Sequence, residues 1–240
     1  MKVLAIETAT AVCSIAVVEN GVVLGERSFE ERQMHSEKII ALIDQSLRAS
    51  SLTMKEIEGL AISIGPGSFT GLRIGLSTAK GIGCALGIPL AAVSTLEALA
   101  SRVVGERTTA EGSYVLAAID ARRDEVYAAG YRMKKKLEEQ IRPCAIEARS
   151  LIRLVGREPN VLLVGDGAEK LVRSLSAERS ALEDQIRLAP PELRRCSATM
   201  VGILGEQQLR RGMHADIASL EPMYVKEFYT TVNPQPFVHV

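Results

Sequence analysis

A glycine-rich loop carries the residues with the clearest chemical potential in this sequence. It reads Gly65-Pro66-Gly67-Ser68-Phe69-Thr70-Gly71 and joins a short apolar run to a helix-forming segment. Free backbone N–H groups at the start of a helix attract anions, so the loop could bind phosphate. It lacks the Walker A spacing, and Arg73 does not stand where the phosphate-binding lysine would. A strand-to-helix turn capped by Ser68 or Thr70 is the simpler interpretation.

Two other groups of residues are of types that catalyse reactions, but the further residues that such chemistry needs are missing. Ser77-Thr78-Ala79-Lys80 has the SxxK spacing of acyl-transfer enzymes, but the other motifs of that chemistry are absent. The histidines, His35, His214 and His239, are too dispersed for a zinc or iron site. We therefore expect no catalytic residue and no metal ligand in this chain.

Two turns occupy the places where a two-lobed nucleotide-binding fold would contact phosphate and metal. The first is Glu7-Thr8-Ala9-Thr10, after the first apolar strand, and the second is Gly165-Asp166-Gly167. Neither has persuasive chemistry of its own. We expect them to form at most a vestigial nucleotide site, made of Glu7, Thr8, Thr10, Gly165, Asp166 and Gly167.

The elements that position these motifs begin with three antiparallel strands. Asn20-Gly21 favours a tight type I′ turn between the second and third strands. Parallel strands joined by helices follow, and Ser94-Thr95-Leu96-Glu97 is a capping box that opens a helix. The expected strands are 3–6, 13–18, 22–29, 59–64 and 89–93, and the expected helices are 36–47 and 69–86.

The second half of the sequence repeats this order. Strands are expected at 114–119, at 126–131, after Lys134-Lys135-Lys136 and at 161–164, with helices at 150–155, from Gly167 to about 175, and at 198–210. The pattern predicts an α/β protein with a duplicated βββαβαβα order and mixed sheets. That order is typical of the two-lobed actin, Hsp70 and sugar-kinase architecture.

The polar stretch around residues 107–113 marks the expected boundary between the lobes. We predict a first lobe at 1–108 and a second at 109–211. A segment at about 212–229 returns to the first lobe, and the tail at 230–240 is mobile because it has little to bury.

Small residues recur along one face of the expected helix 69–86. Gly71, Gly75, Ala79 and Gly83 stand four residues apart, and each interior glycine costs a helix about 0.5–1 kcal/mol relative to alanine. Such a stripe lets another element approach closely. Either the protein's own sheet or helix fills it, or a second protein does. The helix 36–47 also carries an apolar face wider than a single sheet contact requires.

Composition limits the class of protein. The chain has 240 residues, is 47% hydrophobic and has a formal net charge of zero. It should therefore fold, without the global positive charge that a free-standing nucleic-acid binder carries. The four cysteines form no CxxC pair, which favours reduced thiols in the cytoplasm. No stretch approaches the length of a membrane span.

Several stretches resemble the TsaB (YeaZ) family of bacterial tRNA threonylcarbamoyladenosine synthesis. They are 6–10, 35–38, the loop 64–75, 93–99, 119–122 with 125–127, and Pro222-Met223-Tyr224-Val225. The resemblance extends to about Tyr229, and the Gly-Pro-Gly-Ser-Phe-Thr-Gly segment is its most specific part. The paralogue TsaD carries a metal-binding HxxxH, whereas the corresponding segment here, residues 94–101, contains no histidine.

The resemblance implies an accessory subunit that is not an enzyme by itself. Such a subunit pairs with TsaD as a heterodimer, joins the ATPase TsaE in a ternary complex and supports threonylcarbamoyl transfer to the adenosine beside a tRNA anticodon. It reaches tRNA indirectly through the complex and needs no cofactor, whereas the assembled complex uses ATP and Mg²⁺; a direct contact with tRNA stays open. Alone it forms a homodimer through the two first-lobe helices. The expected interface is His35, Ile39, Ile43, Leu47, Gly71, Leu72, Gly75, Leu76, Ala79 and Gly83.

Two enzymatic alternatives stay open. A nucleotide-dependent transferase or hydrolase could act alone through the cleft between the lobes, with Glu7 and Asp166 handling Mg²⁺. A peptidase is the other, but it would need a nucleophile and base or a metal site, and neither is visible in the sequence.

Overall fold

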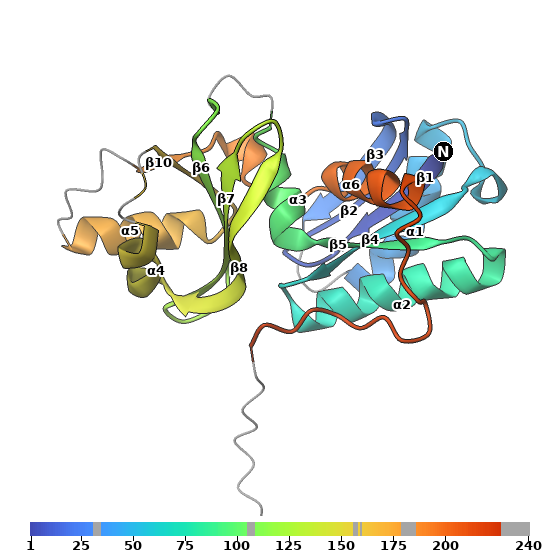
Figure 1. Cartoon of the computed structure of the whole chain (residues 1–240). Coiled ribbons are helices and arrows are strands. Elements are labelled where there is room, and N and C mark those ends of the chain that lie inside the picture. The colour runs from blue at the N-terminus through green and yellow to red at the C-terminus, as the bar shows by residue number, and fades with distance from the viewer. Residues whose placement is uncertain (31–34, 105–108, 156–157, 159, 179–185, 227–240) are drawn as a thin grey trace, which may run out of the picture.

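Two mixed β-sheets flanked by helices form two lobes that lie side by side (Figure 1). The computed structural model describes residues 1–30, 35–104, 109–155, 158, 160–178 and 186–226. The predicted mobile tail at 230–240 lies outside these residues. Along the chain, three strands and then alternating helices and strands occur twice, which confirms the predicted duplication of βββαβαβα.

The first sheet has the strand order β3-β2-β1-β4-β5. Its members are β1 (Lys2–Glu7), β2 (Val12–Glu19), β3 (Val22–Glu30), β4 (Gly59–Gly65) and β5 (Leu90–Ser94). The first three are antiparallel, and β4 and β5 run parallel to β1. Asn20 and Gly21 have φ values of 55° and 74°, so the turn between β2 and β3 has the predicted type I′ character.

Successive side chains of the buried strands point to opposite faces of the sheet, which divides the first core into two layers. Leu4 and Ile6 of β1 face helices α1 (His35–Ala49) and α2 (Phe69–Leu86), which cover one side of the sheet. Val3 and Ala5 face the other side, which is covered by α6 (Ala198–Arg210). A short 3₁₀ helix, η1 (Met54–Glu56), precedes β4.

The second sheet has the corresponding order β10-β9-β6-β7-β8. Its strands are β6 (Tyr114–Asp120), β7 (Glu125–Met133), β8 (Leu137–Glu147), β9 (Val161–Val164) and β10 (Ile186–Leu188). Helices α4 (Ala148–Val155) and α5 (Ala168–Glu178) pack together on one face, and the 3₁₀ helix η3 (Pro191–Leu193) leads to α6.

The last helix of each half covers the sheet of the other half. α3 (Thr95–Ser101) follows the first sheet, but Leu96 and Leu99 pack with Val115, Ala117 and other residues of the second sheet. α6 follows the second sheet but lies on the first (Figure 1). These two helices therefore connect the lobes across the predicted division at 1–108 and 109–211. Hydrophobic patterning identifies a buried face without identifying the sheet that buries it.

After α6 the chain returns along the first lobe, past α2 (Figure 1). Ala215 forms an isolated antiparallel bridge with Leu90 of β5. Further on, the Met223 N–H donates to the carbonyl oxygen of Ile64 at 2.7 Å. In the described part of the chain, no helix is long and apolar enough to cross a membrane.

Candidate functional site

The glycine-rich loop is a capped strand-to-helix turn, as the simpler interpretation predicted. Ser68 is extended (φ −62°, ψ 119°), and its hydroxyl accepts a hydrogen bond from the Gly71 N–H at 3.3 Å. The Ser68 N–H donates to the carbonyl oxygen of Ala9 at 2.7 Å, and the Gly65 N–H donates to Thr95 Oγ1 at 3.1 Å. The protein itself therefore accepts from several of the amides that a phosphate would need.

The stripe of small residues on α2 faces the chain's own first sheet. A β-carbon at Gly71 would collide with the carbonyl oxygen of Thr8, and one at Gly75 would collide with Thr8 Oγ1. A β-carbon at Gly83 would lie 3.0 Å from Ile217 Cδ1. These glycines let the turn after β1 and the C-terminal segment approach the helix. Of the two alternatives left open by the sequence, the structure thus contains the internal contact at these three glycines.

The apolar residues expected beside that stripe are also internal. Ile39, Ile43 and Leu47 of α1 are buried against Leu4, Ile6 and Ile15 of the first sheet. Leu72, Leu76 and Ala79 of α2 are buried too. These six residues stabilise the monomer and do not form a free docking surface. His35 begins α1, but its side chain lies outside the described part of the structure.

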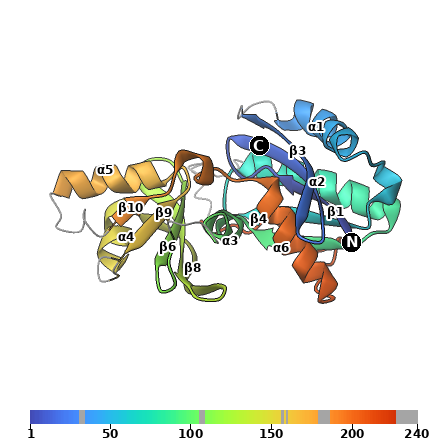
Figure 2. The same ribbon diagram turned by 90° about the horizontal axis from the view of Figure 1, so that it is seen from above.

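The outward faces of the two helices remain available to a partner. On α1, Ile40 is 63% exposed. On α2, Arg73 and Ser77 are exposed, and Leu86 at its end is 37% exposed. α1 and α2 contact each other, so their outward faces belong to one side of the molecule (Figure 2).

An aromatic and cationic cluster ties the start of α2 to the C-terminal segment. The Arg73 guanidinium lies 3.8 Å from the ring centroid of Phe69, and its Nε donates to the Tyr224 hydroxyl at 3.1 Å. The rings of Phe69 and Tyr224 lie 5.4 Å apart. Lys80 Nζ also donates to the carbonyl oxygen of Ala218 at 3.1 Å. The segment thus covers part of α2 and borders its exposed face.

The first half of the expected nucleotide site is closed. Glu7 and Thr8 are fully buried, and Glu7 Oε1 accepts from the Ala9 N–H at 2.6 Å. Glu7 Oε2 and Thr8 Oγ1 have no hydrogen-bond partner. Burial raises the pKa of Glu7 to about 7, and the hydrogen bond from the Ala9 N–H opposes this shift. Thr10 Oγ1 accepts from the Val12 N–H at 3.3 Å.

The second half is built for close packing of the backbone. Gly165 has a φ of +105°, and a β-carbon there would collide with the carbonyl oxygen of Ala118. A β-carbon at Gly167 would lie 2.9 Å from the carbonyl carbon of Ile119. Asp166 is exposed, and its Oδ1 accepts from the Asp120 N–H at 3.0 Å. These glycines accommodate strand β6, and the turn does not form an open phosphate cradle.

Cys196 marks the place where the two halves meet. Burial chiefly raises the pKa of its thiol, and the carboxylates of Glu7 and Asp166 raise it further. Burial likewise raises the pKa of Cys13 to about 12. Both thiols are therefore protonated near neutral pH and are poor nucleophiles. Among the described residues, no group of three or more His, Cys, Asp or Glu side chains could hold a metal ion.

Comparison with known proteins identifies the family. The family model for tRNA N6-adenosine threonylcarbamoyltransferase, TsaD, matches residues 23–233. The tRNA threonylcarbamoyladenosine biosynthesis protein TsaB of Buchnera aphidicola is 31% identical over 183 residues, which is 72% of this chain and 82% of that protein. The chain belongs to the TsaB (YeaZ) family. TsaB of Escherichia coli is 39% identical over 132 residues, which cover 55% of either chain. The match with this relative thus spans only about half of its length.

Solved structures confirm the predicted fold class. YeaZ from Pseudomonas aeruginosa aligns with a TM-score of 0.75 at 25% identity, covering 93% of this chain and 99% of that one. The activator of 2-hydroxyisocaproyl-CoA dehydratase from Clostridium difficile, solved with bound ADPNP, aligns at 0.51 with 10% identity. It covers 93% of this chain and 100% of its own, and this likeness concerns the fold alone. The TsaB family chain described here therefore has the two-lobed actin and sugar-kinase architecture.

Proposed function

We propose that this chain is a non-catalytic partner subunit in the formation of threonylcarbamoyladenosine on tRNA. It acts with TsaD, the transferase, and with TsaE, the ATPase. The observation that carries the proposal is the combination of TsaB family membership with a closed first half-site. The turn after β1 packs against Gly67 and Gly71, where an open nucleotide-binding fold would need room for phosphate.

The outward faces of α1 and α2 are the proposed docking surface. Apart from His35, whose side chain lies outside the described structure, the residues first expected there are buried. The contacts fall instead on exposed side chains, with Ile40 and Leu86 as the apolar ones. An exposed isoleucine in the middle of a helix gains by leaving water, at about 25 cal/mol per Å² of buried apolar area. The same surface serves the homodimer in isolation, so TsaD competes with self-association.

A binding experiment with a matched control tests this proposal. Ile40→Glu should abolish co-purification with TsaD and self-association in sizing runs. Leu154→Glu changes an equally large leucine, 56% exposed on α4, and should leave both intact. If Ile40→Glu binds TsaD as the wild type does, this surface is wrong. If the wild type fails to bind a TsaD that is active with another TsaB, the partner role itself is wrong.

An enzyme that acts alone through the inter-lobe cleft is the competing function. Its best support is Glu7, whose Oε2 is buried without a partner. ATP hydrolysis by the isolated chain that disappears in Glu7→Gln would favour this alternative. The proposed partner role instead requires that the isolated wild type hydrolyse ATP no faster than the variant.

A further inference from the structure

A basic hollow on the second lobe is not used by the proposed docking surface. It has a volume of about 570 Å³ and lies between the β6–β7 turn and the starts of α4 and α5. Four cationic side chains line it, and two acidic ones accompany them. The cationic residues are Arg123, Arg149, Lys170 and Arg173, and the acidic ones are Asp124 and Glu147. The hollow therefore has a positive excess although the whole chain is neutral.

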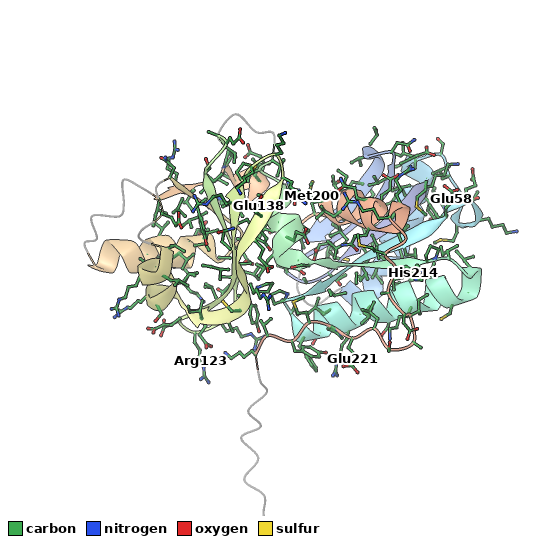
Figure 3. All side chains as sticks on the ribbon, in the orientation of Figure 1. Glu58, Arg123, Glu138, Met200, His214 and Glu221 are labelled. Carbon is green, nitrogen blue, oxygen red and sulfur yellow. The ribbon has the colours of Figure 1, made fainter. Side chains whose placement is uncertain are left out.

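The turn that places Arg123 at this hollow is conformationally costly. Arg122 and Arg123 have φ values of 67° and 47°, so two successive residues with side chains adopt the left-handed region. Each costs roughly 1 kcal/mol relative to a glycine or asparagine, which would suit such a turn better. Strain of this kind is retained where the surrounding structure enforces it, often at binding sites. Figure 3 shows Arg123 at the lower edge of the second lobe.

The structure holds this strained turn firmly. Asp120 Oδ1 accepts from the Arg122 N–H at 2.7 Å and from Lys170 Nζ at 2.6 Å. Lys170 also donates to the carbonyl oxygen of Glu125 at 3.0 Å, which bridges α5 to the turn. The carbonyl oxygen of Asp124 accepts from the Ala148 N–H at 2.9 Å, which joins the turn to α4. The arginines are thus presented from a rigid frame.

Two of the guanidinium groups lining the hollow, those of Arg123 and Arg173, have donors that are not used by the described residues. Arg123 is exposed and forms no ion pair with any described residue. Arg173 is exposed, and its Nε donates to the carbonyl oxygen of Glu169 at 3.4 Å, so neither terminal nitrogen is used by a described residue. Arginine matches phosphate oxygens with paired hydrogen bonds, and three of the four cations here are arginines.

We infer that this hollow binds phosphate groups of the RNA backbone, so that the chain contacts the RNA substrate directly. The choice of RNA rests on the proposed function, whereas the phosphate chemistry rests on the side chains alone. The volume admits a phosphate with its sugar. Direct contact goes beyond the expected indirect contact through the complex.

The test measures binding of an unmodified tRNA transcript to the isolated full-length chain by fluorescence anisotropy at several salt concentrations. We expect the wild type to bind at 50 mM salt. Arg123→Ala combined with Arg173→Ala should weaken binding about tenfold and reduce the slope of log K against log salt by about 1.5, as the loss of two phosphate contacts requires. Arg142→Ala combined with Arg211→Ala removes the same charge from exposed sites outside both the hollow and the proposed docking surface, and should change neither.

Three results would overturn the inference. They are failure of the wild type to bind at 50 mM salt, equal losses in both double variants, and displacement of the RNA by polyglutamate as readily as by polyphosphate. The last would assign the hollow to an acidic protein. Co-purification with TsaD should be normal in both double variants. If the wild type does not bind TsaD, the partner role is contradicted, whereas the measured anion binding still stands.

Discussion

The replacement Glu7→Gln should stabilise the protein increasingly as pH rises. Burial raises the pKa of this carboxyl from 4.5 to about 7, so the folded state keeps its proton where the unfolded state has lost it. The contribution of this raised pKa to the free energy of unfolding is fully present below pH 4.5 and is lost as pH rises to 7. At about 1.4 kcal/mol per pH unit, the wild type loses on the order of 3 kcal/mol across that window. Glutamine keeps the acceptor for the Ala9 N–H without the charge.

Urea unfolding of both proteins at pH 5, 6, 7 and 8 measures this difference. The variant should match the wild type within about 1 kcal/mol at pH 5 and exceed it by about 3 kcal/mol at pH 8. In thermal unfolding the same gap corresponds to about 6–12 °C for a chain of this size. A wild type that gains stability over the variant between pH 5 and pH 8 would refute the reasoning. It would mean that a positive group stabilises the Glu7 carboxylate, as the enzymatic alternative requires.

Two further predictions concern stability. Gly71→Ala should cost about 2 kcal/mol in urea unfolding, because its β-carbon meets the backbone of Thr8. Gly81→Ala in the same helix, with nothing within 4 Å, should instead gain about 1 kcal/mol, and similar values for both would contradict the packing of α2 on that turn. Glu206→Ala should cost about 3 kcal/mol, because this buried carboxylate accepts from the N–H groups of Asn20 and Gly21 and pairs with Arg210. A thermal shift below 3 °C would show that these donors find other acceptors.

Local signals in the sequence were sufficient to predict the order of elements. Asn20-Gly21 determines a hairpin through its backbone preferences, and Ser68 and Ser94 both cap helices as expected. Each of these signals acts within a few residues, so no knowledge of the tertiary structure is needed.

Contacts between distant segments were not predictable in this way. The glycine stripe of α2 indicates close approach, but nothing in its spacing identifies the turn at Thr8 as the neighbour. The burial of Glu7 depends on elements across the whole chain, so its raised pKa has no local signature. The basic hollow brings together Arg123 and Arg173, fifty residues apart, because α5 packs against β6.

The exchange of α3 and α6 between the sheets has a consequence for synthesis on the ribosome. The first sheet is complete once residue 94 has been made, but the helix that covers Val3 and Ala5 begins only at Ala198. For about a hundred residues of elongation, that face of the sheet lacks α6, and among the residues already made only Ala98 of α3 packs there from a helix in the described cluster. Translation at roughly 5–20 residues per second makes this interval several seconds long. The nascent chain therefore exposes an apolar sheet face to chaperones until its second lobe is nearly finished.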